Sequence, residues 1–310
     1  MESWPALPYR AWRDTCTNLQ LRTQIVGKIR LAQTPWINHS WHVTLYVSGR
    51  GMTTGPIPYR EQMFQIDFDF VEHQLLVRLE DGRTRSMPLL EQTVADFYAQ
   101  LFGLLAQLGL EIKINRTPNE VSNPIRFDED REHRAYDAPA VERFWRALLQ
   151  IDRVFTLFRS GFLGKVSPVH FFWGSFDLAV TRFSGRRAPF RGGGTPGLPE
   201  VVVQEAYSHE VSSAGFWPGG DGVEDAAFYS YAYPEPEGFS AAAVLPRAAS
   251  YHGQLGMFTL PYEAVRSAAL PDDTLLSFLQ STYDAAADLG HWDRASLECA
   301  IGVPGVPRRP

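Results

Sequence analysis

The sequence predicts an α+β fold made of two consecutive αβ4α units, in which helices cover antiparallel sheets. Two long stretches with apolar residues at helical spacing each precede a run of segments in which apolar and polar residues alternate. Each run is followed by another helical stretch that ends in Leu-Gly. Aromatic residues make up 13% of the chain, which favours strands because large rings pack well on a pleated sheet.

The first half opens with a predicted amphipathic helix over residues 10–33, which Pro35 ends because proline cannot continue a helix. Strict alternation then puts Phe64, Ile66 and Phe68 on one face of a strand. The further elements expected in this half are strands at 40–49, 61–72, 73–82, 81–88 and 110–116, and a helix at 89–109.

The second half is expected to repeat this order. A long helix covers 138–164, and "KVSPVHFFWGSFDLAVTRFSG" (165–185) reads as its first strand. The elements expected after it are strands within 200–220, 226–236 and 252–261, and a helix at 272–290.

Short internal matches support the repeat. "VSGRG" at 47–51 corresponds to "FSGRR" at 183–187, and "AQLG" at 106–109 to "ADLG" at 287–290. We expect one compact domain over 1–310 with pseudo-repeats at about 1–116 and 135–310, joined by a charged, solvated connector at 117–134. The sequence leaves open whether the two sheets join edge to edge or face each other.

Composition narrows the class of partner. A net charge of −6 disfavours nucleic acid, because binding a phosphate backbone needs a basic surface. Cys16 and Cys299 lie far apart, which argues against a disulfide framework and a thiolate metal site. No stretch is long and apolar enough to span a membrane, and the first residues lack the pattern of a signal peptide. We therefore expect a cytoplasmic, reduced protein.

No cofactor is predicted. The glycine-rich stretch "RGGGTPG" (191–197) lacks the lysine and the following helix of a phosphate-binding loop, so it reads as a flexible linker. No dinucleotide-binding glycine pattern follows a predicted strand.

A family resemblance rests on two long motifs. "FLGKVSPVHFFWGSFDLAVTRFSGRRAP" (162–189) and "YSHEVSSAGFWPGG" (207–220) resemble an uncharacterised bacterial protein family known only as a domain of unknown function. The resemblance covers nearly the whole chain and implies a bacterial, stand-alone, cytosolic protein. It implies no reaction.

The leading functional hypothesis is a small-molecule ligand bound in an aromatic and histidine-lined cleft between the repeats. A carboxylate beside aromatic walls suits a polar ring or a cation. On the strand at 165–185, alternation places Trp173 and Asp177 on one face and His170 on the other. The residues expected to line the cleft are Trp36, Asn38, His39, His170, Trp173, Asp177, His209 and Trp217.

Two alternatives stay open. One is a hydrolase-like enzyme, in which Asp177 orients His209 as a general base. Its metal-assisted version would combine His39 and His42 with a third donor, His170 or Glu210, although no metal is predicted from two histidines alone. The other alternative is a structural or interaction protein whose aromatic residues only fill the core. The oligomeric state is open.

Overall fold

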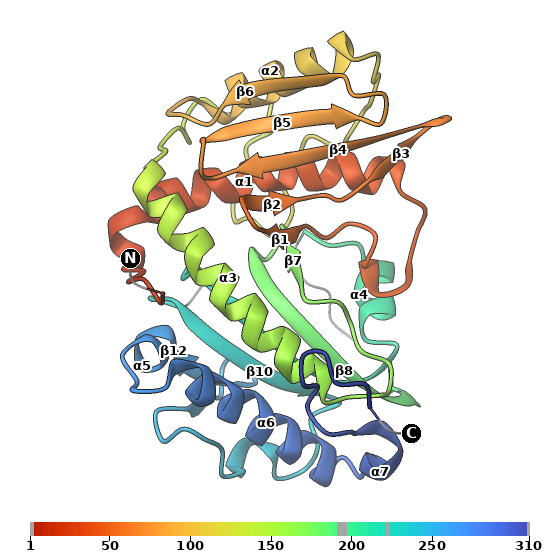
Figure 1. Cartoon of the computed structure of the whole chain (residues 1–310), viewed down its shortest axis with the longest axis vertical. Helices are drawn as coiled ribbons and strands as arrows, with labels where there is room; N and C mark the ends of the chain where they lie inside the picture. The colour runs from red at the N-terminus through yellow and green to blue at the C-terminus, as the bar shows by residue number, and fades with distance from the viewer. Residues whose placement is uncertain (1–2, 191–196, 221–222, 309–310) are drawn as a thin grey trace.

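The computed structural model describes residues 3–190, 197–220 and 223–308 (Figure 1). It contains two six-stranded antiparallel sheets together with helices, which confirms the α+β class. The helices are α1 (Tyr9–Gln33), η1 (Asn38–Ser40), α2 (Val94–Gln107), α3 (Ala138–Ser160), α4 (Glu200–Ala206), η2 (Phe239–Ala241), α5 (Tyr262–Arg266), α6 (Pro271–Leu289) and α7 (Arg294–Leu297). The strands of the first sheet are β1 (Tyr46–Ser48), β2 (Gly51–Thr53), β3 (Ile57–Tyr59), β4 (Gln62–Asp69), β5 (Gln74–Leu79) and β6 (Thr84–Pro88). Those of the second sheet are β7 (His170–Phe172), β8 (Asp177–Arg187), β9 (His209–Trp217), β10 (Ala227–Tyr233), β11 (Ser250–His252) and β12 (Met257–Pro261).

Each sheet is a chain of antiparallel neighbours. The first runs β1-β2-β4-β5-β6, with β3 paired to β4, and the second runs β11-β12-β10-β9-β8-β7. The predicted number of four strands per half is wrong, because short strands flank the long alternating ones. Whether the halves are true repeats stays a prediction.

The two sheets meet edge to edge at one point. Leu45 donates its backbone N–H to the carbonyl oxygen of Phe171 (2.9 Å), and the Phe171 N–H donates back to Leu45 (2.8 Å). This bridge joins the β1 edge of the first sheet to the β7 edge of the second. Helix α3 crosses the seam between them and contacts both β1 and β8 (Figure 1). The seam therefore has a short backbone connection with a long helix packed across it.

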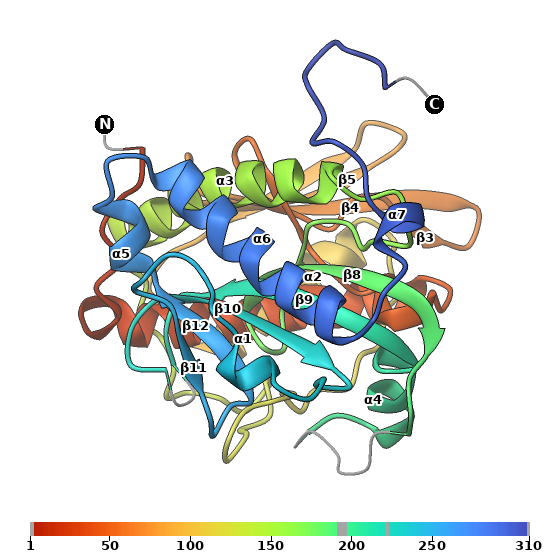
Figure 2. The same ribbon diagram turned by 90° about the horizontal axis from the view of Figure 1, so that it is seen from below.

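Helices lie on both sides of this seam. Figure 2 shows α3 and α6 on one side and α1 on the other. Helix α6 packs on β9 and β10, and α2 packs on α1 and β6. The predicted apolar face of β4 is confirmed, since Phe64, Ile66 and Phe68 are all buried.

Helix α1 is buried on its polar side as well as its apolar side. Gln24 accepts a hydrogen bond from the backbone N–H of Asn119 (2.8 Å) and donates one to its carbonyl oxygen (2.9 Å). Lys28 donates to the carbonyl of Thr117 (2.7 Å), and Arg22 donates to that of Leu90 (2.9 Å). Polar side chains of α1 thus form hydrogen bonds with backbone groups of loop segments. Buried polar groups need such partners.

The connector after residue 116 is consequently not a solvated one. Asn18 donates to the carbonyl of Ala135 (2.8 Å), which holds its far end on α1. Phe127 and Asp130 in its middle are both buried. The expectation of a solvated connector at 117–134 is wrong for these anchored residues, although most of its arginines are exposed.

Three predicted strands have different structures. Residues 165–185 form two strands, β7 and β8, with a tight turn at 173–176 in which Phe176 has a positive φ of 56°. Residues 200–206 form helix α4 although they contain three consecutive valines, and the predicted strand at 110–116 is irregular backbone. Residues 191–196 of the predicted linker lie outside the described residues.

No helix within the described ranges is both long and apolar enough to cross a membrane.

Two helical glycines offer a matched test of the packing of α1. A methyl group on Gly27 would lie 2.1 Å from the Trp173 ring, whereas one on Gly103 in α2 would meet no atom within 4 Å. Gly27→Ala should therefore lower the free energy of unfolding by about 1–3 kcal/mol. Gly103→Ala should raise it by up to about 1 kcal/mol, because alanine is the better helix former. Urea unfolding measures both, and a stabilising Gly27→Ala would contradict the contact with Trp173.

The anchoring of the connector can be tested in the same way. Gln24→Ala leaves both backbone groups of Asn119 without these partners, so it should cost about 1–3 kcal/mol of unfolding free energy. It should also speed trypsin cleavage after the exposed Arg126. The control is Gln100→Ala, because Gln100 is exposed on α2 and should change neither quantity. Equal effects of the two variants would show that the connector does not depend on α1.

Candidate functional site

A lysine and two histidines meet close to the seam between the two sheets. Lys165 Nζ donates to Nε2 of His39 (2.5 Å), and the ring centroids of His39 and His209 are 6.2 Å apart. The Lys165 ammonium also lies 4.7 Å from the centroid of Phe183 and 5.6 Å from that of Trp41. We call these five residues the junction cluster, because His39 and Trp41 come from the first half of the chain and the others from the second.

Backbone geometry fixes the two residues at its centre. His39 lies in η1 with φ 57° and ψ 24°, a left-handed conformation that is uncommon outside glycine. Its Nδ1 is 3.3 Å from the carbonyl oxygen of Ala206, at the end of α4. Lys165 is fixed by pairing with β8, since its carbonyl accepts from the N–H of Phe183 (3.0 Å). The strands of the second sheet therefore bring Lys165 to a turn of the first half.

The hydrogen bonds assign the proton on His39. A lysine ammonium only donates, so Nε2 is the acceptor and the proton sits on Nδ1, facing the carbonyl of Ala206. Burial, followed by the nearby Lys165 charge, lowers the pKa of His39. Burial also lowers the pKa of Lys165, and burial with the charges of Lys165 and Arg187 lowers that of His209. The cluster at neutral pH thus combines one cationic amine with two neutral imidazoles.

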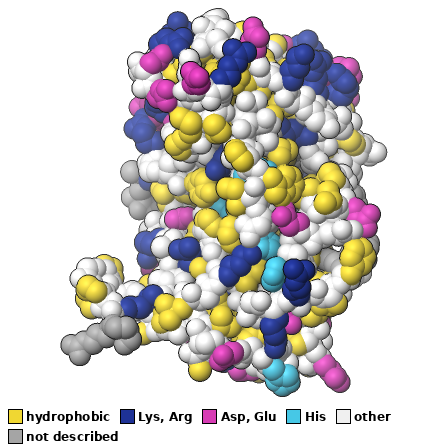
Figure 3. All heavy atoms as spheres, turned by 90° about the vertical axis from the view of Figure 1, so that its right-hand side faces the viewer, with side chains coloured by type: hydrophobic (Ala, Val, Ile, Leu, Met, Phe, Trp, Pro, Cys, Tyr) yellow, Lys and Arg dark blue, Asp and Glu magenta, His cyan; other side chains and the backbone are white. Residues whose placement is uncertain are grey.

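Among the described residues, the Lys165 ammonium has no ionic partner. Throughout the part of the chain that the structure describes, no carboxylate lies within ion-pair distance of it. Glu205 is the acidic group whose charge acts on it, and Glu205 accepts a hydrogen bond from Nε1 of Trp36 (2.6 Å). Figure 3 shows the face of the molecule on the α4 side, where histidine side chains reach the surface beside basic and apolar ones.

Three of the eight predicted residues belong to this region. His39 and His209 are in the junction cluster, and Trp36, which is 52% exposed, is connected to it through its hydrogen bond to Glu205. His170 lies behind the cluster, with its ring centroid 6.4 Å from that of Trp41. It is buried, its Nδ1 has no hydrogen-bond partner within the described ranges, and burial followed by the charge of Arg30 lowers its pKa to about 3.

Asp177 and Trp217 belong to a different group. Asp177 is buried and accepts hydrogen bonds from Ser175 and from the hydroxyl of Tyr229 (2.5 Å). Trp217 stacks on Tyr229, with 4.2 Å between the ring centroids. Burial raises the pKa of Asp177. Both carboxylate oxygens have internal partners, so this group has the character of a packed polar network.

The predicted partnership of His209 with Asp177 is wrong. His209 pairs with Arg187 at one end of β8, whereas Phe216 pairs with Leu178 beside Asp177 at the other end. Seven residue steps of β9 separate His209 from Phe216, a distance of roughly 23 Å at the usual strand rise. The two side chains therefore belong to separate groups, and a general base made of His209 oriented by Asp177 is ruled out.

The remaining two predicted residues have simpler positions. Trp173 is buried against α1, and its Nε1 donates to the carbonyl of Val43 (2.8 Å). Asn38 is an exposed residue of η1. Within the three described ranges no group of three or more His, Cys, Asp and Glu side chains could hold a metal ion.

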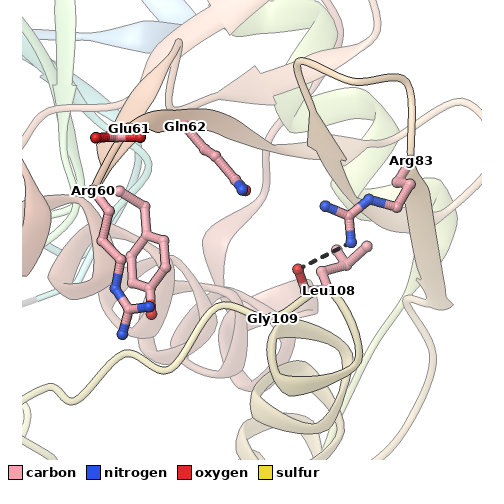
Figure 4. Close-up of a pocket in the computed structure, with 7 residues that line it drawn as sticks. Arg60, Glu61, Gln62, Arg83, Leu108 and Gly109 are labelled. Carbon is pink, nitrogen blue, oxygen red and sulfur yellow. Dashed lines mark hydrogen bonds between the residues drawn. The ribbon is translucent and has the colours of Figure 1, made fainter.

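A separate pocket of about 470 Å³ lies on the first sheet, between the β3–β4 turn and the end of α2 (Figure 4). It is lined by Tyr59, Arg60, Glu61, Gln62, Arg83, Leu108 and Gly109. Arg83 is half exposed and already pairs with Asp81 (2.7 Å). Arg60, the other cation of this pocket, is exposed, whereas Lys165 is half buried, so we favour the junction cluster over this pocket as the functional site.

Sequence reasoning missed Lys165. Lys165 and His39 are 126 residues apart in sequence, so no local pattern reveals their contact. One signal was available, because the chain contains only three lysines, Lys28, Lys113 and Lys165. Lys113 is exposed and Lys28 is held inside by Thr117. Lys165 is thus the half-buried lysine that lies among titratable groups.

The fold and this site define an α+β protein of two joined antiparallel sheets with a lysine–histidine cluster near the seam. The chain belongs to DUF5996, a family of unknown function, whose model matches residues 4–299. This confirms the predicted resemblance to a domain of unknown function, while the bacterial source stays a prediction. Neither the curated proteins nor the solved structures gave a match.

His170 should make the protein sensitive to acid. Its folded pKa of about 3 lies below the ordinary histidine pKa of 6.5, so on acidification the unfolded chain takes up a proton at this residue before the folded chain does. The stability that the neutral ring contributes is present above pH 6.5 and is lost as the pH falls, by up to about 1.4 kcal/mol per pH unit.

His170→Phe should make the free energy of urea unfolding less dependent on pH between pH 6 and 4, because the variant no longer takes up this one proton on unfolding. His291→Asn is the control, because His291 is exposed and asparagine tolerates its positive φ of 52°. An unchanged slope in His170→Phe would show that His170 takes up its proton in the folded state.

Proposed function

We propose that the protein binds a small anionic ligand at the junction cluster. The observation that carries this proposal is the Lys165 ammonium, which is half buried and has no ionic partner in the described part of the chain. A partly desolvated charge is costly unless it is paired. A carboxylate or phosphate would supply the missing pair.

The donors of the cluster fit such a ligand. An ammonium has three N–H donors, and Lys165 gives one to His39. His209 and the exposed Arg187 lie opposite each other on β9 and β8 and add donors at the edge of the cluster. These groups could meet an anion from more than one side.

The walls of the cluster favour a ligand that also has an apolar or planar part. Trp41 and Phe183 pack against each other edge to face, with 6.1 Å between their centroids, and the Lys165 ammonium lies over both rings. Trp36, which donates to Glu205, adds an exposed ring nearby. A few polar groups among aromatic rings is the usual composition of a small-molecule site.

Anion binding should stabilise the native protein against thermal unfolding. A ligand at a hundredfold excess over its Kd contributes about 2.7 kcal/mol. Benzoate and inorganic phosphate are suitable probes, because they separate the aromatic from the purely ionic contribution. Lys165→Met should abolish the stabilisation by either probe, since methionine keeps an apolar chain and removes the charge. Binding to the unchanged protein should tighten as the pH falls, because His39 and His209 then become cationic.

Lys113→Met is the matched control, because Lys113 is exposed and far from the cluster in sequence. It should leave the stabilisation intact. Circular dichroism establishes that both variants are folded before the comparison. Equal responses of the unchanged protein and Lys165→Met to both anions would overturn the proposal and favour a purely structural role for the cluster.

A further inference from the structure

Lys165 has the surroundings of a reactive amine as well as those of an anion-binding group. Its Nζ is already in hydrogen-bond contact with a neutral imidazole nitrogen, Nε2 of His39. A base within this distance can remove a proton from the ammonium without any rearrangement. Burial lowers the pKa of Lys165, which increases the fraction of free amine near neutral pH.

The groups around Lys165 are consistent with this chemistry. His39 and His209 are imidazoles that can exchange protons, and Glu205 is the acidic group whose charge acts on the amine. Trp41 and Phe183 present ring faces that exclude water from one side of Nζ. Excluding water favours condensation, because water is the product that must leave.

The other two lysines lack this combination. Lys28 is 4% exposed, and its ammonium donates to the backbone of Thr117 below the rings of Phe127 and Trp173. Lys113 is exposed to solvent on irregular backbone. The chain therefore contains one lysine in a reactive setting, one structural lysine and one ordinary surface lysine.

We infer that Lys165 forms an imine with an aldehyde or an α-keto acid that also carries an acidic group. The inference rests on the proposed function, since the same cluster would hold the acidic group while the carbonyl carbon meets Nζ. His39 is the base and then the acid of the step, because it contacts the reacting nitrogen directly.

The step balances without any oxidant or reductant. His39 takes a proton from the Lys165 ammonium, and the free amine attacks the carbonyl carbon, so that the C–N bond forms as the C=O π bond breaks. A proton moves from nitrogen to the former carbonyl oxygen and gives a carbinolamine. His39 then returns its proton to that hydroxyl group, the C–O bond breaks, and water leaves. The product is the protonated imine on Lys165.

Reductive trapping tests the inference on the full chain. Glyoxylate, an aldehyde with a carboxylate, is incubated with the protein in the presence of cyanoborohydride, which reduces the imine and leaves a carboxymethyl group on the nitrogen. Peptide mass spectrometry then compares the three lysines. We expect Lys165 to be labelled about tenfold or more faster than Lys113, as general base assistance would allow. Propionaldehyde, which has no acidic group, should label Lys165 more slowly than glyoxylate.

Labelling of Lys165 no faster than Lys113 would overturn the inference. Equal labelling by glyoxylate and propionaldehyde would overturn the requirement for an acidic group.

Two variants separate this inference from the proposed function. Lys165→Arg keeps the positive charge but has no nucleophilic amine, so it should retain stabilisation by benzoate or phosphate and lose trapping at position 165. If anions stabilise the unchanged protein but Lys165 is not trapped, the imine fails and anion binding stands. If Lys165 is trapped but no anion stabilises the protein, anion binding fails instead.

His39→Asn tests the base. Asparagine adopts left-handed backbone readily, so the turn at η1 is kept while the imidazole is removed. Trapping at Lys165 should slow about tenfold or more at neutral pH, and the deficit should shrink at alkaline pH, where the amine loses its proton unaided. A rate equal to that of the unchanged protein at every pH would show that His39 is not the base.

Discussion

Hydrogen bonds from the buried polar side chains of α1 to the backbone of other segments hold the two halves of this chain in register. Gln24 and Lys28 pair with residues 117–119, and Gln20 donates to Gly174 in the β7–β8 turn (2.7 Å). Because these groups are wholly or partly desolvated, each requires its partner, and the partners come from the connector and from the second half. The same helix leads directly into η1, so its position determines where His39 meets the second sheet.

The periodic parts of the fold could be predicted from sequence. The long helices at 10–33 and 272–290 and the alternating strand at 61–72 follow from local spacing, and the structure confirms them within a few residues. The segment 165–185 was harder, since a strand and a hairpin with a four-residue turn both preserve alternation. The valines of α4 favoured a strand, but the segment packs on η1 as a helix, and tertiary contact overrides intrinsic propensity.

The residues of the site could be predicted only in part, because their contacts depend on segments far apart in the sequence. His39 and His209 stood out by residue type, but their true neighbour, Lys165, is set by the pairing of the segment before β7 with β8. Asp177 stood out equally but lies in a different group of side chains. The pairing of β8 with β9 places Asp177 and His209 at opposite ends of these strands. Sequence thus indicated which residue types could act, while pairing between distant strands decided which of them meet.

The bridge between Leu45 and Phe171 also bears on solubility. Separated from each other, the two sheets would each present an unpaired edge, at β1 or β7, with buried side chains such as Leu45 and Phe171 brought to the surface. Open edges of this kind recruit strands from other molecules and lead to aggregation. Each half therefore covers the exposed strand edge of the other. A fragment that contains only one half is expected to aggregate unless the other half is present.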